Sequence, residues 1–148
     1  MDLPGEIAGV LDRLAARRGD DVTARKPCLR CRAVALDVRD DRTDTPLDDN
    51  FQGYGQTITD RAGGYRFRTI RPVPYPGRTP HIHFAVSAPG LAPFTTQMYI
   101  AGEPLNERDG VLTGVRDPAA RARLIVPLRP APEIEPDALA GTFDIVLG

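Results

Sequence analysis

The stretch YRFRTIRPVPYPGRTPHIHFAVSA, residues 65–88, decides the fold class. Its first residues alternate, with Tyr65 and Phe67 on one face and arginines between them, which is typical of a half-buried strand. Residues 71–80 are rich in proline, and because proline has no backbone N–H, they cannot form an inner strand. Apolar and polar residues alternate again over residues 81–88. The stretch therefore predicts two strands joined by a Pro-rich irregular loop.

Further short strands, punctuated by Gly and Pro, are expected on both sides of this stretch. The predicted strands cover residues 56–60, 95–101, 124–128 and 142–147, with one more inside residues 28–38. One helical turn is expected over residues 118–123. We therefore predict an all-β fold, a β-sandwich of about seven or eight short strands with a small N-terminal helix.

The predicted N-terminal helix covers residues 5–18. Apolar residues fall there at i, i+3, i+4 and i+7, and Gly19 is a natural stop, the apolar positions being Ile7, Val10, Leu11 and Leu14. The residues that follow, up to about residue 50, are polar and poorly periodic.

Composition excludes several classes of function. The chain has 148 residues, 19 Lys plus Arg and 20 Asp plus Glu, so its net charge is −1 and it lacks the excess of basic residues that nucleic-acid binding needs. No apolar run approaches the ~18 residues of a membrane span, and no secretory signal is visible at the start. Two cysteines, Cys28 and Cys31, make neither a disulfide framework nor a four-thiolate zinc site. We expect a cytoplasmic protein.

The densest chemistry lies in PYPGRTPHIHF, residues 74–84. In a strand, His81 and His83 point to one face, away from the apolar side chains between and after them. They are the only two histidines in the chain, which excludes a site of three histidines. Tyr75 stands between two prolines six residues earlier and is a candidate phenolate ligand.

Other interpretations of the two histidines stay open at this point. They could be ordinary polar residues on the solvated face of a strand, and Tyr75 an ordinary half-buried tyrosine. A site of two histidines and one carboxylate needs an Asp or Glu, with candidates at Asp60, Glu103 and Asp109, none of them placed by a motif. A phenolate with two imidazoles is a hard, anionic ligand set and favours ferric iron.

Two longer motifs resemble the intradiol ring-cleavage dioxygenases, which include protocatechuate 3,4-dioxygenase and catechol 1,2-dioxygenase. They are PLDDNFQGYGQTITDRAGGYRFRTIRPVPYPGRTPHIHF, residues 46–84, and TTQMYIAGEP, residues 95–104. The resemblance covers about residues 42–148, and it implies a β-sandwich, in agreement with the strand pattern.

The resemblance also implies a metal and a reaction. The family holds Fe(III) with two tyrosines, two histidines and solvent. Here it implies His81 and His83 as ligands, Tyr75 as the tyrosinate that leaves the metal and acts as a base, Arg78 as the residue that stabilises charge on the substrate, and Gln97 as its partner. The implied reaction opens a catecholic ring between its hydroxyls with O2 and gives a muconate-type diacid.

The N-terminal part departs from the family. The other Tyr ligand is expected roughly ten residues before the PLD element, where this chain has Leu36, and residues 20–50 contain no Tyr or Trp. Tyr54 stands at a position that is commonly aromatic or apolar, so it is not taken as a ligand. We treat residues 1–41 as an atypical segment and 42–148 as the domain. A shifted reading frame, a divergent three-ligand site and a scaffold without catalysis each explain the departure.

Three hypotheses follow. The first is a non-haem Fe(III) intradiol dioxygenase acting with O2 on a small aromatic diol, catechol-like or hydroxyquinol-like. The second is a catalytically impaired β-sandwich of the same fold, serving in binding or assembly. The third is another mononuclear metalloenzyme that uses His81 and His83 with a carboxylate. Fold analogy also predicts a homodimer.

Overall fold

The computed structural model describes residues 54–60, 63–88, 90 and 92–147, together with the backbone of three strands nearer the N-terminus, 9–11, 17–18 and 32–37. This part of the chain is mostly sheet, with a few short helices. Its strands are β1 Gly9–Leu11, β2 Arg17–Arg18, β3 Arg32–Asp37, β4 Tyr54–Ile58, β5 Phe67–Thr69, β6 His81–Ser87, β7 Phe94–Ile100, β8 Ile125–Val126, β9 Arg129–Pro130, β10 Leu139–Gly141 and β11 Val146–Leu147. Its helices are η1 Pro104–Glu107, α1 Gly110–Gly114 and α2 Pro118–Arg123.

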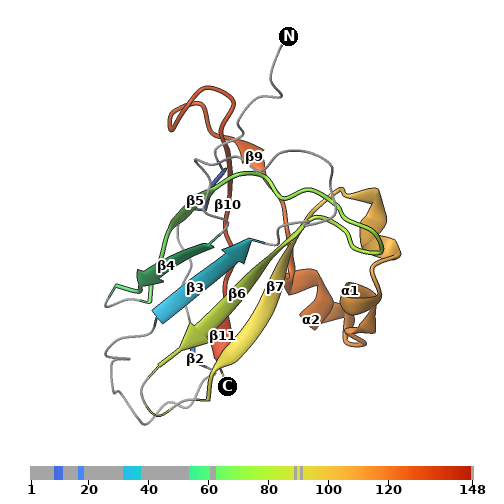
Figure 1. Cartoon of the computed structure of the whole chain (residues 1–148), viewed down its shortest axis with the longest axis horizontal. Helices are drawn as coiled ribbons and strands as arrows, with labels where there is room; N and C mark the ends of the chain where they lie inside the picture. The colour runs from blue at the N-terminus through green and yellow to red at the C-terminus, as the bar shows by residue number, and fades with distance from the viewer. Residues whose placement is uncertain are drawn as a thin grey trace.

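The central sheet has five strands in the order β4-β3-β6-β7-β8. Only β7 and β8 run parallel within it, and the other neighbours are antiparallel. Figure 1 shows β4, β3, β6 and β7 side by side, with α1 and α2 beyond β7. The histidine strand β6 is therefore an inner strand, paired on both sides, and its backbone is held firmly in register.

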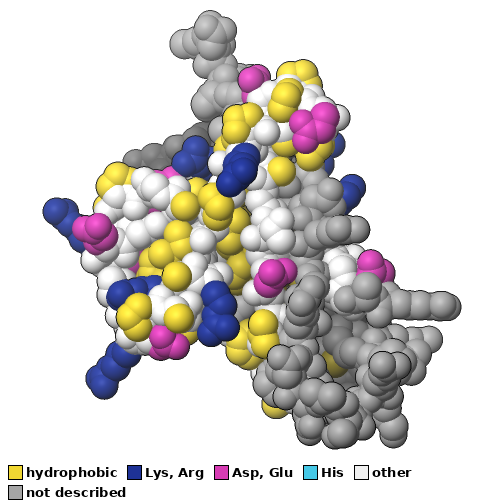
Figure 2. Space-filling model, turned by 180° about the vertical axis from the view of Figure 1, so that it is seen from behind, with side chains coloured by type: hydrophobic (Ala, Val, Ile, Leu, Met, Phe, Trp, Pro, Cys, Tyr) yellow, Lys and Arg dark blue, Asp and Glu magenta, His cyan; other side chains and the backbone are white. Residues whose placement is uncertain are grey.

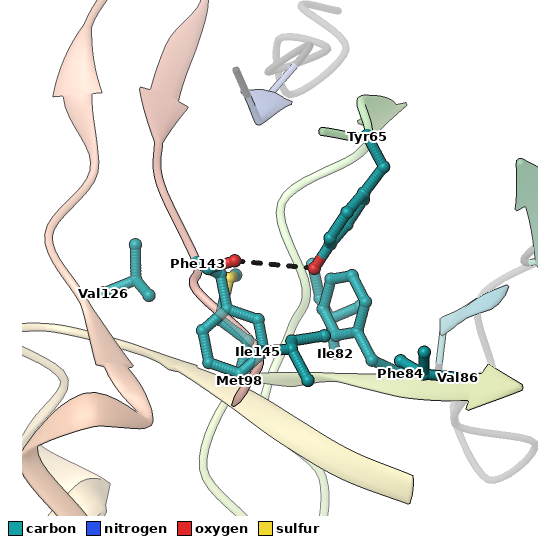
Figure 3. Packing of buried hydrophobic residues seen from close by; sticks show 8 residues of the cluster. All are labelled: Tyr65, Ile82, Phe84, Val86, Met98, Val126, Phe143 and Ile145. Carbon is teal, nitrogen blue, oxygen red and sulfur yellow. Dashed lines mark hydrogen bonds between the residues drawn. The ribbon is translucent and has the colours of Figure 1, made fainter. Parts of the chain in front are cut away.

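Two smaller sheets complete the described structure. One has the order β5-β1-β10-β9, and the other pairs β11 with β2. The main apolar cluster lies between the central sheet and the C-terminal strands (Figure 3), and consists of Tyr65, Ile82, Phe84, Val86, Met98, Val126, Phe143 and Ile145. Alternation along β6 sends Ile82, Phe84 and Val86 into this core, so His81 and His83 face the other way.

The N-terminal helix predicted over residues 5–18 is wrong at the positions that the structure describes. Gly9–Leu11 is strand β1, which pairs with β10 on one side and β5 on the other, and Arg17–Arg18 is strand β2. A helix of this length is marginal by itself, and pairing with two strands far along the chain outweighs its local period. Short pairings of this kind, including β9 and β10, also make the strands more numerous than expected.

Two aspartates begin the two α-helices. Asp109 accepts hydrogen bonds from the amides of Val111 and Leu112, and Asp117 accepts one from the amide of Ala119. Each satisfies backbone donors that a helix leaves unpaired in its first turn. The predicted helical turn at residues 118–123 coincides with α2, which has a Pro in its first turn.

The surface carries charges of both signs. Figure 2 shows Lys and Arg side chains interspersed with Asp and Glu around apolar side chains on the face seen from behind. This agrees with the near-zero net charge of the sequence. Among the described residues, no helix is long and apolar enough to cross a membrane.

Candidate metal centre

The two predicted histidines come together at one point. His81 and His83 share a face of β6, and their Nε2 atoms lie 3.2 Å apart. Nδ1 of His81 lies 2.6 Å from the carbonyl oxygen of Thr79. Because a carbonyl only accepts, Nδ1 carries the proton and Nε2 keeps its lone pair for another partner.

Tyr75 reaches the same point from the Pro-rich loop. Its backbone forms an isolated bridge with Arg78, in which the Arg78 amide donates to the Tyr75 carbonyl at 2.8 Å, and Gly77 between them has a φ of +83°. This tight turn brings the Tyr75 hydroxyl to 3.4 Å from Nε2 of His81. A phenol oxygen and two imidazole nitrogens therefore converge, although their residues are separated by a proline-stiffened loop.

This donor set fits a ferric ion in part. The separations of 3.2 Å and 3.4 Å match neighbouring ligands on one ion with bonds of about 2 Å. One phenolate and two imidazoles supply three protein donors with one anionic charge. Within the described residues, no group of three or more His, Cys, Asp or Glu side chains could hold a metal, so Tyr75 is the third donor that the geometry offers.

The candidate carboxylates are engaged elsewhere. Asp109 binds Arg78, Glu103 pairs with Arg71, and Asp60 accepts from the amide of Gly64. The structure therefore lends no support to a site of two histidines with one of these carboxylates.

Burial keeps both histidines neutral. It lowers the pKa of His81, an effect opposed by the hydrogen bond to Thr79 and reinforced by the charge of Arg78. Burial also lowers the pKa of His83, and the charge of Arg78 and the unfavourable protonation of both rings together lower it further. A neutral imidazole is the form that binds a metal, so the site is ready for one at neutral pH.

Arg78 lies beside the three donors and is held on several sides. Its Nη1 donates to the Tyr75 hydroxyl at 3.2 Å, and its Nη2 donates to Oε1 of Gln97 at 2.6 Å. Its Nε donates to Oδ2 of Asp109 at 2.8 Å. Burial alone would lower the pKa of Arg78, but the bond and charge of Asp109 outweigh it and raise the pKa. The guanidinium is therefore a fixed positive charge at the edge of the donor set.

Gln97 and Tyr99 come from β7, directly opposite the histidines. In the β6–β7 register Gln97 pairs with His83, and Tyr99 pairs with His81. The Tyr99 hydroxyl donates to Oε1 of Gln97 at 2.6 Å and accepts from Nη2 of Arg78 at 3.3 Å. The predicted contact between Gln97 and Arg78 is present.

Sequence reasoning missed Tyr99 and the role of Asp109. Tyr99 is two residues after Gln97 in a predicted strand, so the period of two could have placed both on one face. From the sequence alone, Asp109 was expected only as a candidate metal ligand. The pattern of an Asp before a short apolar helix signals an N-cap, but no local signal indicates that its second oxygen binds Arg78.

In the sequence window where the family has its second tyrosine ligand, the structure describes only strand β3. Leu36 pairs with His83 on one side and with Tyr54 on the other. Tyr54 itself lies on the edge strand β4 and is 54% exposed, as suits a residue outside the site. Residues 20–31 and 38–50, the rest of the window in which the tyrosine was sought, lie outside the described residues.

A family model described as Dioxygenase matches residues 36–148, three quarters of the chain and the whole of this site. The chain belongs to the intradiol dioxygenase family. This intradiol family member is 43% identical over 115 residues to the protocatechuate 3,4-dioxygenase beta chain of Burkholderia cepacia, covering 72% of this chain and 48% of that protein. It is 34% identical over 88 residues to hydroxyquinol 1,2-dioxygenase of Rhodococcus opacus, covering 47% of this chain and 29% of that protein.

A solved dioxygenase structure shares this fold. The dioxygenase domain of a dioxygenase carbohydrate-binding protein fusion from Streptomyces sp. SirexAA-E superimposes with a TM-score of 0.67 at 30% identity, over 97% of this chain and 80% of that one. The chain spans about half the length of the Burkholderia relative, or 48%, and 29% of the Rhodococcus relative.

Proposed function

We propose that this chain is a non-haem iron-dependent intradiol dioxygenase, with Fe(III) held by Tyr75, His81 and His83. It would open a catecholic ring between its two hydroxyls with O2 and yield a muconate-type diacid. The observation that carries the proposal is the convergence of one phenol oxygen and two imidazole nitrogens beside a fixed guanidinium. We assign the function to residues 42–148, taken as a β-sandwich domain, whose sheets also include strands β1 and β3 from the segment 1–41.

In the proposed reaction, Tyr75, Arg78 and Gln97 each have a separate role. Ferric iron, when bound, supplies a Lewis acid that draws electron density from the catechol oxygens. Tyr75, as a phenolate near the substrate, takes up the proton that a catechol hydroxyl gives up. Arg78, fixed 3.2 Å from the Tyr75 hydroxyl, stabilises the negative charge that develops on the substrate, and Gln97 holds the guanidinium in place.

The substrate is proposed as a class. The relatives are named for protocatechuate and for hydroxyquinol, which share two adjacent hydroxyls on one ring. We propose a catechol-like or hydroxyquinol-like diol for this chain. The homodimer and the cytoplasmic location stay predictions from fold analogy and from the sequence.

One observation favours the second candidate, a scaffold that has lost catalysis. The chain has Leu36 where the family's other tyrosine is expected, and no tyrosine between residues 20 and 50. With one phenolate instead of two, the preference of the site for ferric over ferrous iron is weaker. The same fold would then serve in binding or assembly.

Colour and oxygen uptake separate the two candidates. A tyrosinate bound to Fe(III) gives a visible charge-transfer band, so the iron-loaded protein should be burgundy to brown. Consumption of one O2 per catechol, with a muconate-type product, would establish the dioxygenase. A coloured protein without oxygen uptake would favour the impaired scaffold, and a protein that stays colourless with ferric iron would refute the iron site.

Variants test the ligands individually. Tyr75→Phe should abolish the visible band, while Tyr54→Phe is a matched control, because Tyr54 is exposed on the edge strand. His83→Gln should weaken iron binding by more than the roughly 10–100-fold that loss of an outer partner of a metal ligand costs. A band that survives Tyr75→Phe would show that Tyr75 is not the phenolate donor.

A further inference from the structure

Asp109 is a buried carboxylate whose two oxygens serve different elements. Its side chain is 0% exposed. Oδ1 accepts from the amides of Val111 and Leu112, both at 3.0 Å, and so caps helix α1. Oδ2 accepts from Nε of Arg78 at 2.8 Å and from the amide of Thr79 at 3.0 Å. One group therefore fixes both a helix and the end of the loop that carries Tyr75.

The two residues that bind Oδ2 of Asp109 each contact different residues of the metal centre. Arg78 reaches Tyr75 and Gln97 through its Nη atoms. Thr79 reaches His81 through its carbonyl oxygen, which accepts the Nδ1 proton. Asp109 makes none of these last contacts itself, so any effect it has on the chemistry passes through Arg78 and Thr79.

A second side chain supports the same connection. The Thr79 hydroxyl donates to Oδ1 of Asn106 at 2.8 Å, and Nδ2 of Asn106 donates to the carbonyl of Ile100 at 2.8 Å. Asn106 and Asp109 lie three residues apart in the segment between β7 and α1. Thr79 is therefore held through its backbone amide by Asp109 and through its side-chain hydroxyl by Asn106.

Charge makes the Asp109 contact the stronger of the two. Burial alone would raise the pKa of Asp109, but the hydrogen bonds from Leu112, Arg78 and Thr79, together with the charge of Arg78, lower it below the ordinary range. The carboxylate is therefore ionised at neutral pH. A charge-assisted bond at Nε fixes the plane of the guanidinium, because Nε and both Nη atoms are coplanar.

We propose that Asp109 is a positioning residue, which aims the Arg78 guanidinium at Tyr75 and Gln97 and, through the Thr79 backbone, sets the orientation and tautomer of His81. The proposal rests on the proposed function for its catalytic meaning, whereas the orientation itself can be measured without metal or substrate. It predicts that removal of the charge acts on turnover through Arg78 and not through the stability of α1.

Asp109→Asn is the informative variant, and Asp117→Asn is its matched control. The amide keeps an oxygen for the helix cap but presents an N–H donor to Arg78 and Thr79 instead of an acceptor. Asp117 is also an N-cap of a neighbouring short helix, is exposed, and contacts only the amide of Ala119 among its side-chain hydrogen bonds in the described residues. Both variants lose one charge and both keep a cap.

The first measurement is NMR on the metal-free protein. In the wild type and in Asp117→Asn, the Nε–H of Arg78 should exchange with solvent far more slowly than that of the exposed Arg116. In Asp109→Asn the protection should be lost. Exchange at Arg78 that is as fast as at Arg116 in the wild type would overturn the proposal, even if Asp109→Asn fails to fold. Unchanged protection in Asp109→Asn would also overturn it.

The second measurement is a double-mutant cycle on the iron-loaded protein. Asp109→Asn should lower kcat about 10- to 100-fold with a smaller change in KM, and Asp117→Asn should not. When Arg78→Ala is already present, Asp109→Asn should add a smaller loss than it causes alone, because the guanidinium it positions is gone and only its contact with the Thr79 amide remains. Losses that multiply would overturn a role through Arg78. A wild type that cleaves no catechol would refute the proposed function, and the NMR result would still decide the positioning.

Discussion

On one face of β6, Ile82, Phe84 and Val86 pack into the apolar cluster with Tyr65 and Met98. On the other face, His81 is 1% exposed and yet surrounded by polar groups. Ile82, Phe84 and Val86 are buried by packing of apolar side chains, whereas on the other face His81 is buried within a connected set of hydrogen bonds and His83 is half-buried. The same alternation along a single strand therefore supplies the core and the candidate metal centre.

The two faces of β6 differ in how strictly their stability depends on the positions of individual atoms. Apolar burial is non-directional and roughly proportional to area, so the core depends on volume and shape. The polar face depends on individual donors and acceptors, since a buried group that loses its partner costs the whole of its desolvation. A change on the core face should therefore lower stability with the apolar volume removed and spare the metal centre, whereas a change on the polar face should cost stability with each hydrogen bond lost and disturb the metal centre.

The largest effect is expected from Phe84→Ala. Phe84 is 0% exposed at the centre of the cluster, and its removal should lower the free energy of unfolding by about 3–5 kcal/mol in a urea titration. Protein that remains folded should keep the position of its visible band with Fe(III). Phe94→Ala is the control, because Phe94 at the start of β7 is exposed. Equal losses from the two substitutions would contradict the core assignment.

A smaller effect is expected from two buried tyrosines, one on each face. Tyr99→Phe removes the hydroxyl that bonds Gln97 at 2.6 Å and should cost about 1 kcal/mol. Tyr65→Phe removes only a long contact of 3.5 Å to the Phe143 carbonyl (Figure 3) and should cost less than about 0.5 kcal/mol. Urea titrations of both variants at one pH provide the comparison. A Tyr65→Phe cost equal to or above that of Tyr99→Phe would remove the distinction between the faces.

The mildest perturbation is a change of pH on the metal-free protein. Burial lowers the pKa of His81 and His83 in the folded state, so the unfolded chain binds protons more readily. The free energy of unfolding should be constant above neutrality and should fall as the pH drops below about 6.5, the ordinary histidine pKa, until the folded pKa values are passed. His83→Gln should make the decline shallower. A flat profile between pH 7.5 and 5 in the wild type would contradict the burial of both rings.

Strands and helices could be predicted from the sequence where apolar residues recur with a clear period. The strands expected at residues 81–88 and 95–101 are β6 and β7 to within a residue, and the helical turn at 118–123 is α2. The helix expected at residues 5–18 is wrong at Gly9–Leu11 because pairing with β5 and β10 outweighs the helical spacing of the apolar residues there. Local pattern cannot identify a partner so far along the chain.

The candidate site divides in the same way. The sequence placed His81 and His83 on one face and offered Tyr75 as a phenolate ligand, the resemblance added Arg78 and Gln97, and the structure brings these residues together. The sequence did not indicate that Asp109 pairs with Arg78, because 31 residues separate them and the contact forms only when the segment after β7 folds back on the Pro-rich loop. Whether iron binds these donors stays a prediction.

The sequence by itself determined the strand character of residues 81–88 and the shared face of its two histidines, because the period of two follows from the covalent geometry of an extended chain. It also carried the family, through motifs that lie close together in the chain. Only the tertiary structure decided which groups surround those histidines, through the tight turn that returns Tyr75 and the pairing of β7 that adds Gln97 and Tyr99. It also placed the buried Asp109 against Arg78 and Thr79. Such contacts depend on how distant segments pack, and no local period encodes that packing.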